Sequence, residues 1–429
     1  MKTELVFVPS PGRGHIVAII EFAKRLLEQE QRLSVTILVI KRPYSTKIDS
    51  DTEELAAINT NIRFIDLPQV DPPESINCFE HFMSVYIDKH KSHLKDAMVN
   101  HILSKSTPIA GLVIDGFCSP MIDIANELDI PSYLFFTSGA AFLGLMLYLP
   151  TRHSQIGSEF KLSDPDLIIP TYAHPIHSRI TPSFLLDKGG YTSFLNHGTR
   201  FKETKGFIIN TFAELEPHAI EYLKAATEFP PIYTVGPVLN FKIEKQLKSK
   251  IIMNWLDNQP TSSVVFLCFG SLGGFEPPQL TEIATALERS EIRFLWSARP
   301  PPPKLEVLAH EAVGGFVSHC GWNSILESLW NGVPIATWPV YAEQQPNAFE
   351  LVKELELAVE LTLDYRIERA DKIVVADDIE KALRSLMDTE SPVRKRVKDI
   401  GQKGRKALMN GGSSFISLGR YVQDILVDK

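Results

Sequence analysis

The segment Pro9-Ser10-Pro11-Gly12-Arg13-Gly14-His15 places a histidine directly after an apolar run and at the start of an amphipathic one. Glycines here allow a tight turn and close approach of a ligand. The segment is not a dinucleotide fingerprint, because the third glycine is missing, nor a Walker A loop, because no Gly-Lys-Ser/Thr follows. His15 therefore has two interpretations. It is either a general base facing the carboxyl ends of the strands or an exposed histidine at a helix start.

Asp115 ends the apolar run Val113-Ile114 and is the second residue suited to proton transfer. A carboxylate at this point can accept a hydrogen bond from a histidine, fix its tautomer and stabilise the imidazolium. An aspartate after a strand also commonly caps the following helix. The sequence leaves both roles open.

The segment from Gly314 to Glu327 carries the densest set of polar side chains. It reads as a strand, a turn of small residues and a helix that begins near Ser324. Backbone N–H groups at such a helix start, together with Asn323 and Ser324, would hold a diphosphate without a metal. His319 can add a donor, and Glu327 lies one turn further on, where it can accept two ribose hydroxyls. An ordinary capped helix explains Ser324 but not the crowding of histidine, tryptophan and asparagine beside it.

Two more strand ends carry polar residues. Glu343 and Gln344 follow the apolar strand around residues 334–338, and they combine a pure acceptor with an amide that both donates and accepts, which suits a sugar. Ser271 follows Gly270 after another apolar run and supplies a further donor.

Short apolar runs alternate with amphipathic stretches, which predicts α/β structure with parallel sheets. We expect strands at residues 5–8, 33–40, 61–67, 109–114, 132–136, 206–211, 231–235, 264–270, 293–297, 315–318 and 334–338. We expect helices at residues 16–27, 121–128, 140–147, 280–288, 324–330, 377–387, 393–408 and 415–426. A boundary is expected after Gly236-Pro237, and the lysine-rich stretch that follows at 241–250 is either a linker or the exposed start of a helix. A ligand cleft is expected between the two similar halves.

The composition limits the classes of function. The chain has 429 residues, 44% hydrophobic and 22% charged, with a net charge of −8, which is typical of a globular protein and argues against a nucleic-acid partner. No apolar run approaches the ~20 residues of a membrane span. The four cysteines are far apart and form no metal-binding pair, so we expect no metal and the reducing cytosol as compartment. We also expect a monomer.

Together these segments closely resemble the plant secondary-product UDP-glycosyltransferases, which are inverting enzymes of the GT-B fold. The resemblance rests on the run Gly315-Phe316-Val317-Ser318-His319-Cys320-Gly321-Trp322-Asn323-Ser324, on Glu327-Ser328 and Gly332-Val333-Pro334, and on Glu343-Gln344 at its end. It also includes Asp115, the segment Phe136-Thr137-Ser138 and the turn Cys268-Phe269-Gly270-Ser271. The likeness covers nearly the whole chain and its signature is long and specific.

The resemblance implies an acceptor-binding Rossmann-like domain at residues 1–237, a UDP-sugar-binding domain at 238–414, and a helix at 415–429 that crosses back. It implies that His15 is the base and Asp115 its partner. The residues implied in donor binding are Thr137, Trp322, Glu343 and Gln344 for the sugar, Ser271, His319, Asn323 and Ser324 for the diphosphate, and Glu327 for the ribose. The residues implied in acceptor binding are Phe117, Met121 and Tyr341.

One part of the family signature is missing. Its opening Trp-Ala-Pro-Gln, whose tryptophan stacks on uracil, corresponds here to Pro301-Pro302-Pro303-Lys304. The strand-rich stretch that usually precedes it, after Ser297, is also absent. We therefore expect altered recognition of uracil rather than altered chemistry.

The resemblance implies transfer of a sugar from UDP-sugar, most simply glucose because of Gln344, to a hydroxyl of an apolar plant metabolite such as a flavonoid, a phenol or a triterpenoid. No cofactor is expected, since the UDP-sugar is a co-substrate. The alternative is a non-catalytic small-molecule or nucleotide-sugar binding protein on the same fold. A nicotinamide oxidoreductase is excluded by the lack of a glycine fingerprint.

Overall fold

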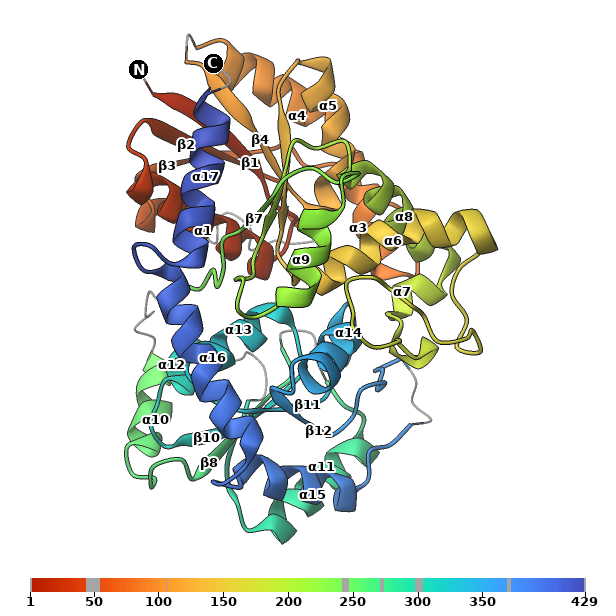
Figure 1. Ribbon diagram of the computed structural model, residues 1–429, viewed down its shortest axis with the longest axis vertical. Coiled ribbons are helices and arrows are strands. Elements are labelled where there is room, and N and C mark those ends of the chain that lie inside the picture. The colour runs from red at the N-terminus through yellow and green to blue at the C-terminus, as the bar shows by residue number, and fades with distance from the viewer. Residues whose placement is uncertain are drawn as a thin grey trace.

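The computed structural model places two α/β units one above the other (Figure 1). It describes residues 2–43, 55–105, 107–240, 247–270, 274–297, 304–368 and 372–427. Each unit is built on one parallel sheet covered by helices.

Within the described residues, seven strands form the N-terminal sheet in the order β3-β2-β1-β4-β5-β6-β7. They are β1 (Thr3–Val8), β2 (Leu33–Val39), β3 (Ile62–Asp66), β4 (Ile109–Asp115), β5 (Ser132–Phe136), β6 (Phe207–Ile209) and β7 (Ile232–Thr234). The inner strands are unbroken apolar runs because helices bury both faces of a parallel sheet. Val8 at the end of β1 pairs with Ile114 near the end of β4. The residues that follow these two strands therefore emerge side by side.

The helices of this unit are α1 (Arg13–Gln29), α3 (Phe79–Asp88), α4 (Lys91–Ala97), α5 (Ile122–Glu127), α6 (Ala140–Ile156), α7 (Ser183–Leu186), α8 (Lys188–Phe201) and α9 (Pro217–Ala225), with the short turns η1 (Met98–Leu103), η2 (Gly116–Met121) and η3 (Ser178–Ile180). The sequence did not predict α8, because its first turn holds Gly189 and Gly190. The Asp187 side chain accepts a hydrogen bond from the Gly190 N–H at 2.8 Å and caps the helix. Phe194 and Phe201 then bury its apolar face.

The C-terminal sheet has the order β12-β11-β10-β8-β9 in the part of the chain that is described. Its strands are β8 (Val264–Cys268), β9 (Arg293–Trp296), β10 (Val313–Ser318), β11 (Ile335–Thr337) and β12 (Ala358–Glu360). Its helices are α10 (Leu247–Leu256), α11 (Pro277–Ser290), α12 (Lys304–Leu308), α13 (Trp322–Trp330), α14 (Gln344–Phe349), η4 (Glu350–Glu354), α15 (Ala376–Met387) and α16 (Pro392–Leu408). Ser318 of central β10 pairs with Cys268 of β8 and with Thr337 of β11. The three polar strand ends of this half therefore lie at one edge of the sheet.

Helix α17 (Ser413–Val427) follows α16 and packs on the N-terminal sheet, beside α1 and β7 (Figure 1). Tyr421 is completely buried and makes edge-to-face contacts with Tyr133 and Tyr233. Asp424 accepts a hydrogen bond from the Tyr233 hydroxyl at 2.6 Å. A helix from far along the sequence thus completes the core of the N-terminal unit.

A tryptophan joins the two units. The Trp322 indole N–H, from α13, donates to the Asn210 carbonyl in the N-terminal unit at 2.7 Å. The same indole lies against Gly139, where an added Cβ would stand 2.7 Å from it. Position 139 therefore has no room for a side chain.

Two carboxyl groups also meet between the units. Glu216 and Glu350 are each only 2% exposed. Burial and the adjacent Glu216 raise the pKa of Glu350 well above its ordinary value. The Oε2 atoms of Glu216 and Glu350 have no hydrogen-bond partner among the described residues. A single proton on Glu350 would turn one of these two acceptors into a donor.

All eleven expected strands are confirmed, with ends that differ by a few residues. The expected helices are confirmed as well. Elements that the sequence did not predict are α3, α4, α7, α8, α9, α12, α14 and β12. Helix α10 begins at Leu247, within the lysine-rich stretch that the sequence gives as a linker or a helix start, while residues 241–246 lie outside the described residues.

Candidate active site

His15 and Asp115 meet where β1 and β4 end. The His15 Nδ1 lies 2.8 Å from Asp115 Oδ2, and the imidazole remains about one-third exposed while the carboxylate is buried. The Thr137 hydroxyl, which follows β5, lies 3.3 Å from the same nitrogen. Three neighbouring strand ends therefore hold one imidazole, whose other nitrogen is available to take a proton.

Burial alone would lower the pKa of His15. The negative charge of Asp115 and its hydrogen bond outweigh burial, with a smaller contribution from Glu343, so the pKa of His15 lies above its ordinary value. This raised pKa means that the imidazole is a stronger base once it is neutral.

Asp115 serves both of the roles that the sequence left open. Its Oδ1 accepts a hydrogen bond from the Phe117 N–H at 3.4 Å and caps η2, while its Oδ2 faces His15. The Ser10 hydroxyl also donates to Oδ1. The sequence analysis did not single out Ser10. The parallel pairing of β1 with β4 is the signal that could have placed it beside Asp115.

The start of α13 gathers the residues expected to bind the diphosphate and ribose. Ser324 is 1% exposed in the first turn, and Glu327 lies one turn further along the same helix. Lys304, the first residue of α12, donates to the Ser324 hydroxyl, and its Nζ lies 3.6 Å from Glu327 Oε2. The sequence analysis placed Lys304 only as the counterpart of the last residue of the missing tetrapeptide.

His319 is packed against backbone at this helix start. An added Cβ at Gly270 would lie 2.9 Å from the His319 Nε2, and one at Gly321 would lie 2.7 Å from it. Burial and the nearby Lys304 ammonium lower the pKa of His319 to about 3. The imidazole is therefore neutral at physiological pH. The implied partner Ser271 lies outside the described residues.

Asn323 connects the two halves of the site. Its side-chain amide donates to the Gly14 carbonyl at 3.3 Å, one residue before His15. The neighbouring Trp322 points its indole into the N-terminal unit instead, where the N–H is already bonded to Asn210. In this arrangement only the backbone of Trp322 is available to a sugar.

Glu343 and Gln344 lie beyond the end of β11. Burial raises the pKa of Glu343, and the nearby His15 opposes this, which places the carboxyl near the His15 imidazole. The Gln344 Oε1 accepts hydrogen bonds from the N–H groups of Val340 and Tyr341 at 2.8 and 3.0 Å. The amide oxygen of Gln344 thus shapes its own loop, and its NH₂ group is the part left to meet a ligand.

The residues implied in acceptor binding fall into three different places. Phe117 is half-buried, with its ring at 6.2 Å from the His15 ring and 5.4 Å from Phe194. Tyr341 lies on the donor side, with its ring 6.5 Å from that of His319. The expectation for Met121 is corrected by the structure, because its side chain is completely buried in the core beneath η2 and presents no surface to an acceptor.

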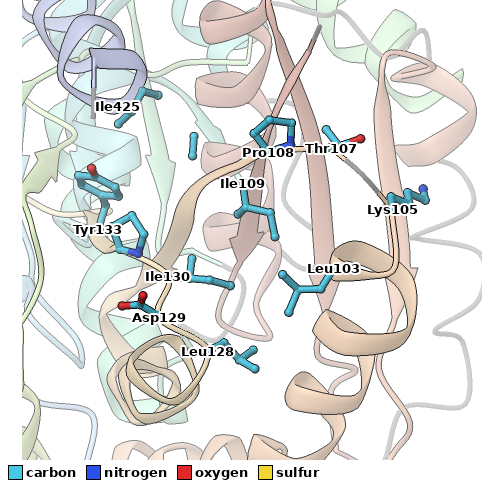
Figure 2. A pocket seen from close by; sticks show the side chains of 12 residues that line it. Leu103, Lys105, Thr107, Pro108, Ile109, Leu128, Asp129, Ile130, Tyr133 and Ile425 are labelled. Carbon is cyan, nitrogen blue, oxygen red and sulfur yellow. The ribbon is translucent and has the colours of Figure 1, made fainter. Parts of the chain in front are cut away.

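A cavity of about 460 Å³ lies away from these residues (Figure 2). It is lined by residues at the amino ends of β4 and β5, such as Ile109 and Ile130, and by Ile425 of α17. Because Asp115 ends β4, the cavity and the His15–Asp115 pair lie at opposite ends of the strand. We assign no part of the reaction to it.

Metal-binding clusters and membrane-spanning helices are both absent from the described residues. No three His, Cys, Asp or Glu side chains gather as a metal site in the ranges that the structure describes. Among the helices of those ranges, none has the length and apolar character needed to span a bilayer.

Comparison with known proteins identifies the family. The model of the UDP-glucoronosyl and UDP-glucosyl transferase family matches residues 229–392. A UDP-glycosyltransferase from Malus domestica is 45% identical over 475 residues, and the alignment covers 99% of each chain. The chain belongs to the plant UDP-glycosyltransferases. The UDP-glucose flavonoid 3-O-glucosyltransferase 6 of Fragaria ananassa is 46% identical to this glycosyltransferase, with 99% of this chain and 98% of the relative covered.

A solved structure shows the same fold. The glycosyltransferase superposes on Medicago truncatula UGT71G1 complexed with UDP-glucose with a TM-score of 0.93 at 43% identity, covering 99% of this chain and 98% of that one. The expected GT-B architecture of two Rossmann-like domains is confirmed. The Malus alignment extends over 475 positions and this chain has 429 residues, so at least 46 aligned positions have no residue here.

Proposed function

We propose that this glycosyltransferase transfers glucose from UDP-glucose to a hydroxyl group of a small apolar plant metabolite, with inversion at the anomeric carbon. The observation that carries the proposal is the His15–Asp115 pair at 2.8 Å, held next to the start of α13 by the Asn323–Gly14 hydrogen bond. A base for the acceptor and a binding site for the leaving diphosphate thus face each other.

In the proposed reaction, Nδ1–H of His15 donates to Asp115, so the neutral imidazole accepts at Nε2. The acceptor oxygen attacks the anomeric carbon from the face opposite UDP, and its proton passes to Nε2. The bond from this carbon to the β-phosphate oxygen breaks, and the electron pair stays with UDP. Positive potential at the start of α13 stabilises that charge.

An aromatic ring lies beside His15 on the acceptor side. Phe117 is half-buried and packs edge-on against His15, with Phe194 of the core behind it. Aromatic side chains favour flat ring systems, and a Fragaria relative is named for a flavonoid acceptor. We therefore propose a flavonoid or another phenol as acceptor before a triterpenoid.

We further propose that the enzyme acts as a monomer in the cytosol and needs no metal. All four cysteines are free thiols, which suits a reducing compartment. The start of α13 supplies positive charge for the diphosphate.

The test is release of UDP from UDP-glucose with and without a phenolic acceptor, with the glucoside identified by mass spectrometry. Acceptor-dependent release of UDP together with a product heavier by one hexose supports the proposal. UDP binding without turnover for any hydroxylated acceptor would favour the alternative, a non-catalytic nucleotide-sugar binding protein.

A further inference from the structure

Lys304 lies beside two residues that are expected to bind the donor nucleotide, Ser324 and Glu327. It begins α12, and its ammonium contacts both the Ser324 hydroxyl and, at 3.6 Å, Glu327 Oε2. The side chains of Lys304 and Glu327 are each about one-fifth exposed. The ammonium therefore lies at the first turn of α13, within reach of a ligand that comes from solvent.

The charges at this point call for an anion. The first turn of α13 carries the positive end of a helix dipole, because its N–H groups have no partner within the helix. A lysine ammonium has the wrong charge for this end of a helix. Within the described residues, the one carboxylate paired with Lys304 is Glu327, and at 3.6 Å this pair is outside hydrogen-bonding distance.

A buried histidine gives an independent indication of a missing ligand. His319 is 6% exposed and lies against Gly321, the residue that caps α13. Its Nδ1 has no hydrogen-bond partner among the described residues. A buried polar atom is rarely left unpaired in a complete site.

We propose that Lys304 is a nucleotide-binding residue of this enzyme. When the UDP-sugar binds, the Lys304 ammonium separates from Glu327 and pairs with the diphosphate. Glu327 is then free to accept hydrogen bonds from the ribose hydroxyls. This inference rests on the proposed function, since it assigns a further residue to the same donor site. It gives the chain a charged phosphate contact at the place where the family signature has a neutral glutamine.

The change of partner of the Lys304 ammonium, from Glu327 to a phosphate group, is electrostatically favourable for two reasons. Lys304 gives up a partly solvated ion pair, which contributes little, and gains a charge-assisted hydrogen bond to a phosphate group. When the bond from the anomeric carbon to the β-phosphate oxygen breaks, the electron pair adds negative charge beside the ammonium, while the acceptor proton goes to His15. The contact therefore strengthens during the reaction.

Calorimetry with UDP and with uridine tests the assignment. In the Lys304→Gln variant we expect UDP affinity to fall by about 5- to 50-fold, as for loss of one charge-assisted hydrogen bond, while uridine affinity is unchanged. Lys304→Arg should restore most of the UDP affinity because it keeps the charge. Lys403→Gln is the matched control, because Lys403 also pairs with a carboxylate, Asp399 at 2.7 Å, on the surface of α16.

A second measurement uses the wild-type enzyme alone. Saturating UDP should protect Lys304 from reductive methylation, read by peptide mass spectrometry, while uridine should not and Lys403 should stay equally reactive. Equal UDP affinity in Lys304→Gln, tighter binding by that variant, or no protection by UDP would overturn the inference. Failure of the wild type to bind UDP would instead overturn the proposed function.

Discussion

Asp115 uses its two carboxylate oxygens for different partners. Oδ1 accepts hydrogen bonds from the Ser10 hydroxyl and the Phe117 N–H, which leaves Oδ2 for His15. A carboxylate held from several sides turns little, so the histidine tautomer is fixed before an acceptor arrives. The two readings of Asp115 from the sequence, helix cap and histidine partner, are therefore compatible.

Replacement of His15 by alanine tests the base. We expect kcat to fall by about 10²–10⁴-fold, the usual effect of removing a general base, while UDP affinity stays unchanged because the imidazole bonds to Asp115 and Thr137 and not to the residues of α13. Initial rates with a weakly acidic alcohol acceptor, together with calorimetry for UDP, give both values. Near wild-type turnover of that alcohol would remove His15 from the role. A strongly acidic phenol is a poor substrate for the test, since it ionises without help.

The pH dependence of the reaction should report the His15–Asp115 pair. His15 acts as a base only when neutral, so kcat/KM falls as the pH drops below its pKa, which the carboxylate raises. In the Asp115→Asn variant no carboxylate offsets the burial of the imidazole, so the pKa of His15 falls. The acid limb of the kcat/KM profile then moves to lower pH. The plateau should also drop by about 10²–10⁴-fold because the imidazolium loses its partner. An acid limb at the same pH in both enzymes would show that another group controls it.

At the scale of single elements, α13 is the feature that replaces a metal in the proposed reaction. Its free N–H groups and the adjacent Lys304 ammonium supply positive charge to the diphosphate. We expect initial rates to be the same with and without excess EDTA. Loss of rate that Mg²⁺ or Mn²⁺ restores would show that a cation takes part.

The sequence predicted those elements whose pattern is local. Strands such as β5 are continuous apolar runs, and residues 132–136 match its observed bounds. Helix α8 was not predicted because the two glycines in its first turn lower its intrinsic helix stability. Tertiary contacts outweigh that cost in the folded protein. Its neighbour α3, whose buried residues include Met83 and Tyr86, also depends on packing against partners distant in sequence.

The site was predictable to the same extent. The strand-end positions of His15, Asp115 and His319 could be predicted because parallel strands bring their carboxyl ends together, while their roles in the reaction stay predictions. The hydrogen bond from Ser10 to Asp115 and the contact of Lys304 on α12 with Ser324 on α13 could not be predicted, because each joins side chains whose relation depends on three-dimensional packing. The prediction that Met121 contacts the acceptor was wrong for the converse reason, since its place in a motif does not reveal that its side chain faces the core.

At the scale of the whole molecule, Trp322 couples the two units. We expect Trp322→Ala to lower the free energy of unfolding by about 3–5 kcal/mol, as for loss of a large buried side chain, and also to lower activity because Asn323 is its neighbour. Denaturant unfolding measures the first effect. Trp255→Ala is the control, since Trp255 is 38% exposed on α10 and should cost much less. Equal losses in the two variants would contradict the assigned role of Trp322.

The Glu216–Glu350 pair predicts a pH-dependent stability. A carboxyl whose pKa is raised in the folded state binds its proton more tightly when folded, so its contribution to stability falls as the pH rises from 4.5 through the folded value. Glu350→Gln keeps a neutral donor at all pH values. We expect it to stabilise the protein at pH 8 by about 1–3 kcal/mol, the cost of an unsatisfied buried group, and to have little effect near pH 5.

Thermal unfolding at the two pH values measures this difference. Replacement of the exposed Glu288 by glutamine is the control and should show no such trend. A stabilisation by Glu350→Gln that is the same at pH 5 and pH 8 would mean that the pair does not share a proton.

The position of α17 has a consequence for biosynthesis. Tyr421 of α17 covers the surface of the N-terminal sheet around Tyr133 and Tyr233. Because α17 is synthesised last, this surface stays exposed on the ribosome after the strands of the sheet have been synthesised. At ~5–20 residues per second, the roughly 180 residues between β7 and α17 take on the order of 10–40 s to synthesise. During that interval the nascent chain presents an aromatic surface to the cell. A chaperone that holds such surfaces would act on this enzyme before its second half is finished, and a chain cut short within the C-terminal unit would be left with that surface permanently uncovered.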